Sequence, residues 1–130
     1  MIKWHEKRDI FALVIVILIA LFIFIISSQS FENGSPGPSW SFKPVLYHFT
    51  VFFLFSFFLS IALTHGRVNN RYLVLFAVLF GVAYGATDEL HQLFVTNRSC
   101  SLEDFAVDSI GVLAASLIYF ISLVFKKSKF

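Results

Sequence analysis

Residues 10–26 read IFALVIVILIALFIFII, a run of 17 residues without a charged or polar side chain. A helix needs about 20 largely apolar residues to cross a hydrocarbon core of roughly 30 Å, so this run is close to the minimum length. Lys7 and Arg8 precede it as in a signal peptide, but the apolar stretch is longer than the usual run of roughly 7 to 15 residues and no A-x-A cleavage pattern follows. We therefore expect a retained transmembrane helix over residues 10–27.

Three further apolar runs follow, and together the four predict an all-α, polytopic membrane helix bundle with four transmembrane helices. The other expected spans are residues 45–64, 72–93 and 105–125. Hydrophobic residues make up 58% of the chain and charged residues 14%, and a soluble domain of 130 residues has too little interior for four such runs. We expect one membrane domain over residues 1–130. The net charge of +2 does not indicate a nucleic-acid partner, and the single cysteine, Cys100, forms no internal disulfide.

The distribution of Lys and Arg predicts the orientation in the membrane. One side of a four-span arrangement carries eight of these residues: Lys3, Lys7, Arg8, Arg67, Arg71, Lys126, Lys127 and Lys129. The other side carries only Lys43 and Arg98. Both termini are therefore expected in the cytoplasm. The outer side then holds six of the eight acids: Glu32, Asp88, Glu89, Glu103, Asp104 and Asp108. A loop rich in Gly, Pro and Ser, residues 29–43, is expected to join the first two helices.

Polar residues from three predicted helices converge at the outer membrane boundary. His48 lies near the outer end of the second helix, residues 88–92 end the third, and Asp104 and Asp108 begin the fourth. At about 100° per residue, one face of the third helix carries Ala77, Gly81, Tyr84, Gly85, Asp88, His91 and Gln92, with Glu89 at its margin. The fourth helix aligns Asp104, Asp108, Gly111, Ala115 and Tyr119. Small residues at this spacing permit close helix approach, so both polar faces are expected to point into the bundle.

The residue types in this cluster favour proton exchange. A histidine beside a carboxylate can serve as general acid and base near neutral pH, and the planar guanidinium of Arg98 suits a carboxylate pair or a phosphate. A metal is not favoured because no H-E-x-x-H or comparable spacing is present, and a serine triad lacks its strand-turn-helix elbow. Two structural readings stay open: the polar groups only hold helices together, or His48 is a snorkelling interface residue. His5 and His65 are assigned no role.

Residues 84–95 read YGATDELHQLFV, and Arg98, Ser101, Asp104, Asp108 and Gly111 follow. This segment resembles the VanZ-like family, whose pattern is similar to Y-x-x-x-D-E-x-H-Q-x-F-V, then R, then S-x-x-D-x-x-x-D-x-x-G, with an upstream histidine helix that His48 matches. The resemblance covers about residues 43–120. The chain departs from the family at three places: Thr96-Asn97 replaces a frequent Pro-Gly, Phe52 a frequent tyrosine, and Ala115 a common glycine.

The resemblance implies a small polytopic protein of the cell envelope, in a family named for a member associated with resistance to the glycopeptide teicoplanin. The leading hypothesis is an outward-facing site that binds or modifies a lipid head group or a lipid-linked envelope molecule, as a head-group-modifying enzyme would. The alternative is a non-catalytic bundle that acts by packing or partner binding. Ion or proton movement is least favoured, because the inner halves of the helices lack charged residues.

The candidate site residues follow from these arguments. The catalytic candidates are His48, Asp88, Glu89, His91, Asp104 and Asp108, and the binding candidates are Tyr84, Gln92 and Arg98. Membrane lipids are the expected partners, with a lipid-linked envelope precursor or a glycopeptide as further candidates. Neither a cofactor nor a metal is expected.

Overall fold

The computed structural model describes residues 4–30 and 42–127, and within them the chain is helical. Four long helices, α1 (Trp4–Ser27), α2 (Phe42–Thr64), α3 (Tyr72–Gln92) and α4 (Leu102–Lys127), are accompanied by a short 3-10 helix, η1 (Val68–Asn70). The predicted fold class is confirmed, since all four are long and apolar enough to cross a membrane. Glu32, Lys3, Lys129 and most of the predicted loop over residues 29–43 lie outside the described residues.

Three helices begin earlier than the apolar runs alone suggest. Helix α1 starts at Trp4, α2 at Phe42 and α4 at Leu102, ahead of the expected starts at residues 10, 45 and 105. Apolar runs mark the part of a helix that lies in hydrocarbon, whereas a helix continues into polar surroundings because its backbone hydrogen bonds are internal. For α4 the start is fixed by a capping serine, described below.

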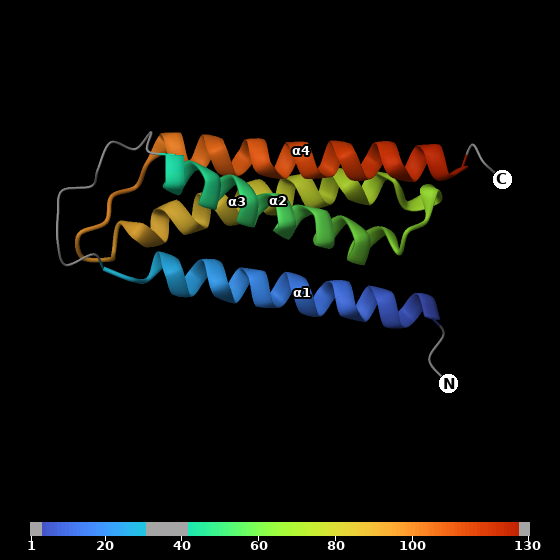
Figure 1. Ribbon diagram of the computed structural model, residues 1–130, viewed down its shortest axis with the longest axis horizontal. Coiled ribbons are helices and arrows are strands. Elements are labelled where there is room, and N and C mark those ends of the chain that lie inside the picture. Colours follow the sequence, from blue (N-terminus) through green and yellow to red (C-terminus); the bar gives the residue numbers. More distant parts are fainter. Residues whose placement is uncertain (1–3, 31–41, 128–130) are drawn as a thin grey trace.

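The helices run alternately up and down, so the start of α1 and the end of α4 lie at the same end of the bundle (Figure 1). Helices α2, α3 and α4 contact one another, and α1 packs mainly along α2. The other end gathers the last turns of α1 and α3 and the first turns of α2 and α4. We call this the polar end, because the residues of the predicted cluster lie there.

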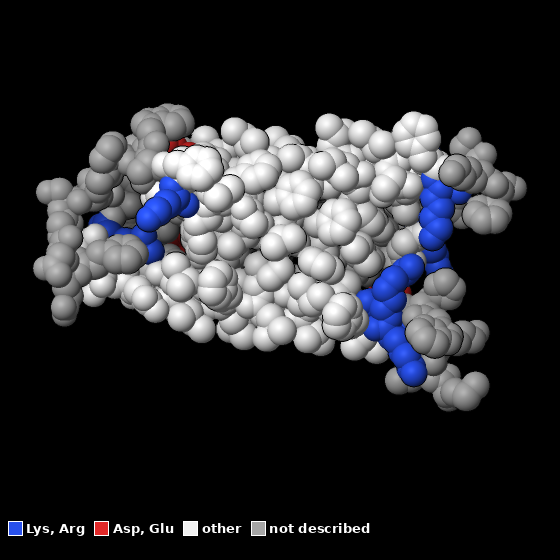
Figure 2. Space-filling model, viewed as in Figure 1, with Lys and Arg blue, Asp and Glu red and all other residues white. Residues whose placement is uncertain are grey.

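The distribution of side chains is the reverse of that in a soluble protein. Large apolar residues are exposed on every helix, among them Phe11 (64%), Leu79 (61%) and Leu117 (60%). Buried positions instead include the polar residues Ser56, Ser60, Thr64 and Ser116. On the face in Figure 2, Lys and Arg gather at the two ends and leave an uncharged band between them. Such a surface is stable when lipid surrounds it.

Small residues let α4 approach its neighbours closely. A Cβ atom added at Gly111 would lie 2.7 Å from the carbonyl oxygen of Phe49 in α2, and one added at Gly81 would lie 2.9 Å from a methyl group of Val112. Hydroxyl contacts follow the α2–α4 interface further along. Ser56 and Ser116 are hydrogen-bonded at 2.9 Å, and Thr64 and Tyr119 at 2.6 Å. The small residues predicted to face the bundle are therefore in contact with helices of the same chain.

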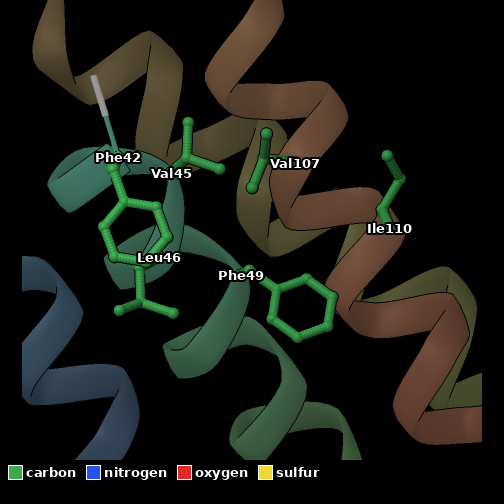
Figure 3. A pocket seen from close by; sticks show the side chains of 6 residues that line it. All are labelled: Phe42, Val45, Leu46, Phe49, Val107 and Ile110. Atoms are coloured by element: carbon green, nitrogen blue, oxygen red, sulfur yellow. The ribbon is translucent and has the colours of Figure 1, made fainter. Parts of the chain in front are cut away.

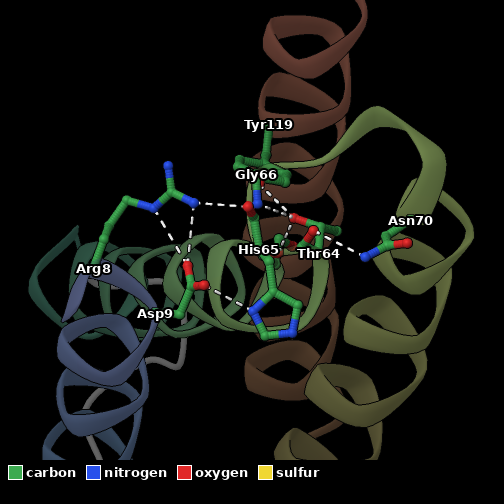
Figure 4. Close-up of polar contacts among 8 residues, drawn as sticks. Arg8, Asp9, Thr64, His65, Gly66, Asn70 and Tyr119 are labelled. Atoms are coloured by element: carbon green, nitrogen blue, oxygen red, sulfur yellow. Dashed lines mark hydrogen bonds and ion pairs between the residues drawn. The ribbon is translucent and has the colours of Figure 1, made fainter. Parts of the chain in front are cut away.

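At the opposite end of the bundle, a polar network that the sequence does not predict joins α1 to the end of α2 (Figure 4). Arg8 donates from Nη2 to the carbonyl oxygen of His65 at 2.7 Å, and to Asp9 at 3.2 Å. The second Asp9 oxygen lies 2.8 Å from Nδ1 of His65. His65 and Gly66 adopt φ values of 53° and 64°, which reverse the chain after α2. His65, to which we assigned no role, therefore holds the end of α2 against α1.

Candidate functional site

The polar end is centred on a contact between α2 and α4. His48 lies in the second turn of α2, and its Nδ1 is 2.9 Å from Oδ1 of Asp108 in α4. The two side chains are only 7% and 1% exposed. A carboxylate oxygen accepts, so Nδ1 donates to it, and this bond fixes the plane of the imidazole ring. The predicted approach of His48 and Asp108 is present in the structure.

The last turns of α3 bring three more predicted residues to the same place. Asp88, Glu89 and Gln92 are buried, at 8%, 2% and 3% exposure. The Gln92 amide donates to Oδ2 of Asp88 at 3.2 Å and to Oε1 of Glu89 at 3.3 Å. Spacings of three and four residues place these side chains on one face of the helix, as the sequence predicts.

Glu89 also holds the start of α4. Its Oε2 accepts a hydrogen bond from the backbone N–H of Ser101 at 2.7 Å, and the Ser101 hydroxyl accepts one from the N–H of Asp104 at 3.2 Å. Ser101 is thus the N-cap residue of α4, which explains why the helix begins at Leu102. A residue at the position of Asp104 often takes the N-cap N–H itself. Here Glu89 does so instead, and the Asp104 carboxylate stays outside the cap.

A cavity of about 250 Å³ opens beside these groups at the polar end. It is lined by Ile26, Ser27, Lys43, Pro44, Tyr47, His48, Asp88, Gln92 and Arg98, from α1, α2, α3 and the loop after α3. The Ser27 hydroxyl, on a side chain 3% exposed, and the Tyr47 hydroxyl have no hydrogen-bond partner among the described residues. The cavity therefore combines two cationic side chains, two available hydroxyls, a histidine and a carboxylate.

Arg98 lies at the edge of this cavity. Its Nη2 donates to the carbonyl oxygen of Ile26 at 3.0 Å, which anchors the loop after α3 to the last turn of α1. That carbonyl belongs to the last turn of a helix, where carbonyl groups lack partners within the helix. The bond holds the guanidinium over the cavity, on the same lining as Asp88.

Two predicted site residues lie against α1 instead of the central cluster. Nε2 of His91 lies 3.0 Å from the Ser28 hydroxyl, and the His91 ring is 4.9 Å from that of Phe24. Tyr84 donates to the carbonyl oxygen of Ala20 at 2.8 Å. Both residues face the protein interior as the helical pattern predicts, but their hydrogen-bond partners belong to α1 or directly follow it.

The structure therefore brings together six predicted residues: His48, Asp88, Glu89, Gln92, Asp104 and Asp108. Two sets among them offer ligand atoms that all lie within 4.8 Å of one another, one formed by His48, Glu89 and Asp104 and the other by Asp88, Glu89 and Asp108. Their elements are α2, α3 and α4, so no local spacing in the sequence would reveal either set.

Three polar residues of the cavity lining were not among the predicted site residues. Ser27 and Tyr47 carry no special sequence signal, although Tyr47 directly precedes His48. Lys43 entered the sequence analysis only as a topology marker, yet it is one of two cations on the outer side of the predicted arrangement. The small number of Lys and Arg residues on this side could have marked Lys43 as a site residue, because the positive-inside rule does not explain a cation on the outer side.

A second cavity, of about 230 Å³, lies between the start of α2 and the start of α4 (Figure 3). Its lining is entirely apolar: Phe42, Val45, Leu46, Phe49, Val107 and Ile110. It offers no group for acid–base chemistry or for holding a charged ligand. We therefore assign the candidate site to the polar cavity.

Comparison with known families agrees with the pattern of this site. The family model described as VanZ/LLP1 matches residues 11–125. The chain belongs to the VanZ/LLP1 family. Because the match begins at residue 11, it includes α1, which the sequence analysis had assigned from topology alone. Neither the curated proteins nor the solved structures that were compared give a match.

Departures from the VanZ/LLP1 pattern have local explanations in the structure. Asn97 adopts φ of 62°, a left-handed conformation that glycine takes freely and asparagine tolerates better than most residues. This agrees with glycine being frequent there in the family. Phe52 is fully buried one turn from His48, with its ring 6.2 Å from that of Tyr84. It forms an apolar layer between the polar cluster and the Ser56–Ser116 contact.

Proposed function

We propose that this VanZ/LLP1 family protein binds the phosphorylated head group of a membrane lipid or lipid-linked envelope molecule in its polar cavity. The observation that carries the proposal is the lining of that cavity. Lys43 and Arg98 supply positive charge, and Ser27 and Tyr47 supply hydroxyls that have no hydrogen-bond partner within residues 4–30 and 42–127. Cationic side chains and hydroxyl groups are the donors that bind the oxygens of a phosphate.

The position of the cavity supports a lipid as the ligand. It lies beside the last turn of α1 and the first turns of α2, where the apolar surface of the bundle ends. The head groups of a bilayer lie at this level. A cavity of about 250 Å³ also suits one phosphate-bearing head group far better than a whole glycopeptide.

His48 gives the site a means of chemical action on a bound head group. It lines the cavity, and the bond from its Nδ1 to Asp108 leaves Nε2 as the nitrogen that can accept or return a proton. Asp88 lies on the same lining as a second acid–base group. Modification of the head group is therefore the reaction class that we propose if the protein is an enzyme.

We further propose that the polar end faces outward and that both termini are cytoplasmic. The excess of Lys and Arg at the opposite end supports this orientation. An outward site has access to lipid-linked precursors of the cell envelope. The association of the family's name with teicoplanin resistance would then reflect an action on such a molecule.

Lipid binding by purified protein tests the proposal. The protein in detergent is titrated with a short-chain phosphatidic acid, and the retained lipid is counted by native mass spectrometry. Lys43→Ala and Arg98→Ala should each weaken binding by about tenfold or more, because a charged hydrogen bond contributes roughly 1.5 to 3 kcal/mol. Arg67→Ala, at the opposite end, is the matched control and should leave binding unchanged.

Equal binding by all of these proteins would contradict the proposal, since the phosphate would then be held elsewhere. A phosphate-free lipid, diacylglycerol of the same chain length, separates head-group recognition from binding of the acyl chains. It should bind weakly to wild-type protein and should not distinguish Arg98→Ala from the wild type.

The alternative of a bundle that acts by packing against a partner receives less support. Its main feature was the stripe of small residues on α3, which would have to meet another protein. Gly81 packs against Val112, and Gly85 packs against Asp108 and Phe52, all within the same chain. That surface is already occupied.

A further inference from the structure

Glu89 belongs to two overlapping sets of metal-ligating side chains. With His48 and Asp104 it forms a set whose ligand atoms lie within 4.8 Å of one another, and with Asp88 and Asp108 it forms a second set at the same separation. Ligand atoms around a bound ion lie roughly 3 to 4 Å apart when each bond is about 2.0 to 2.2 Å. Binding of an ion would therefore draw these ligand atoms closer together.

The imidazole of His48 is already arranged as in a metal site. Its Nδ1 donates to Asp108 at 2.9 Å, and both side chains are buried. The hydrogen on Nδ1 leaves the lone pair of Nε2 available to an ion. Metal-binding histidines commonly donate their second nitrogen to a carboxylate in this way, which fixes the ring and raises its basicity.

The two carboxylates of the first set keep oxygens available as well. Asp104 is not needed at the N-cap of α4, because Glu89 accepts the Ser101 N–H in its place. Glu89 uses each oxygen once, toward Ser101 and Gln92, and a carboxylate oxygen has a further lone pair. Asp104 is also only half-buried, so an ion has a route from the membrane boundary.

A second observation is the buried carboxylate oxygen of Asp108 that no described residue bonds. Its side chain is 1% exposed, and its Oδ2 has no hydrogen-bond partner among the described residues. This oxygen is directed toward α3, 3.5 Å from the place where a Cβ of Gly85 would be. Buried carboxylate oxygens normally have a donor or a cation beside them. A cation among the neighbouring acids would also reduce the repulsion between Asp88, Glu89 and Asp108.

We propose that His48, Glu89 and Asp104 bind a divalent transition-metal ion, with Asp108 orienting His48. One nitrogen and two oxygens suit Zn²⁺ or Mn²⁺, whereas Mg²⁺ and Ca²⁺ prefer oxygen ligands alone. Residues 48, 89 and 104 are far apart in the sequence and form no local ligand motif, so the sequence did not favour a metal. Head-group binding by Lys43 and Arg98 does not depend on the ion. An ion on Nε2 of His48 would occupy the lone pair assigned above to proton transfer, so in the metal-bound protein the acid–base group on the cavity lining is Asp88.

Metal binding by the purified protein tests the proposal. The protein in detergent, stripped with a chelator and without added lipid, is dialysed against Zn²⁺ or Mn²⁺ and its metal content is measured. We expect one ion per chain. His48→Gln, Glu89→Gln and Asp104→Asn should each raise Kd by at least tenfold, and Asp108→Asn by about 10- to 100-fold through the orientation of His48. Glu103→Gln, an acid beside Asp104 but outside both sets, is the matched control and should bind as the wild type does.

A spectroscopic measurement identifies the ligands of the bound ion directly. Electron spin echo measurements on bound Mn²⁺ should detect one coordinated histidine nitrogen, and His48→Gln should remove that signal. Less than one ion per chain at saturation, or equal affinity in Asp104→Asn and Glu103→Gln, would overturn the proposal. Asp104 is half-buried and contacts the cap only through its backbone N–H, so its side-chain variant is expected to fold even if His48→Gln does not. The phosphatidic acid titration is done without metal. A failure to bind metal would therefore overturn only the metal site, and the lipid titration would still test the proposed function.

Discussion

His48, Asp108 and Glu89 each connect two helices in a part of the chain that lipid surrounds. His48 joins α2 to α4, and Glu89 joins α3 to the first residues of α4. In hydrocarbon a polar group has no water to bond, so these side chains are held in position by their hydrogen bonds to the neighbouring helix. The same bonds that hold the helices together therefore also fix the acid–base groups beside the cavity.

Asn97 is a residue whose backbone conformation limits what can replace it. Its φ of 62° lies where a side chain branched at Cβ is strained. Asn97→Gly should keep the free energy of unfolding within about 0.5 kcal/mol, because glycine adopts this conformation freely. Asn97→Val should lower it by about 1 to 2 kcal/mol. Unfolding in detergent by added dodecyl sulfate measures both.

The control for this prediction is Asn69→Val. Asn69 is exposed in η1 and does not have a positive φ, so valine there should have little effect. If Asn97→Val proved as stable as Asn69→Val, the left-handed turn before Arg98 would not constrain the chain.

At the scale of the elements, the approach of α4 to α2 is set by Gly111. A Cβ there would meet the backbone of α2 at 2.7 Å from the Phe49 oxygen and 3.2 Å from the Phe53 nitrogen. Backbone atoms cannot rotate away, so the helices themselves must separate. This separation would also pull His48 from Asp108, which lies one turn before Gly111.

We expect Gly111→Ala to destabilise the protein by about 1 to 3 kcal/mol, as overpacking of a close contact does. The same unfolding assay measures it. Ala106→Leu adds more volume but on an exposed position of α4, and it should be tolerated. Comparable stability of Gly111→Ala and the wild type would show that α2 and α4 are not in close contact in the membrane.

The elements differ in how far the sequence predicts them. Helix positions follow from local hydropathy, so the spans at 45–64 and 72–93 agree with α2 and α3 within a few residues. The helical pattern also identifies the inward face of α3. It does not say which neighbour covers each part of that face: Tyr84 bonds to α1 and His91 to the residue after α1, whereas Glu89 bonds to the N-cap of α4.

The cavity itself was beyond prediction from sequence. Its lining depends on how the last turn of α1, at Ser27, is placed along the first turns of α2, at Lys43 and Tyr47. That relative placement is set by packing between helices and has no local pattern. The residue types of the cluster were predicted, whereas the space beside it was not.

At the scale of the whole molecule, the two ends of the bundle have different characters. The polar end buries three carboxylates and a histidine beside a cavity, and the opposite end joins α1 to α2 through Arg8, Asp9 and His65. The exposed band between them is apolar, as a membrane-spanning protein requires. The proposed function depends on which side of the membrane the polar end faces.

The native cysteine makes that question directly measurable. Cys100 is the only cysteine in the chain, is exposed, and lies in the loop between α3 and α4 at the polar end. Intact cells are treated with a membrane-impermeant maleimide, and Asn69→Cys in a Cys100→Ser background reports on the opposite end. Our account predicts that Cys100 is labelled in intact cells and that Asn69→Cys is labelled only after permeabilisation. Labelling of Asn69→Cys in intact cells, with Cys100 protected until permeabilisation, would place the cavity in the cytoplasm and contradict an outward-facing head-group site.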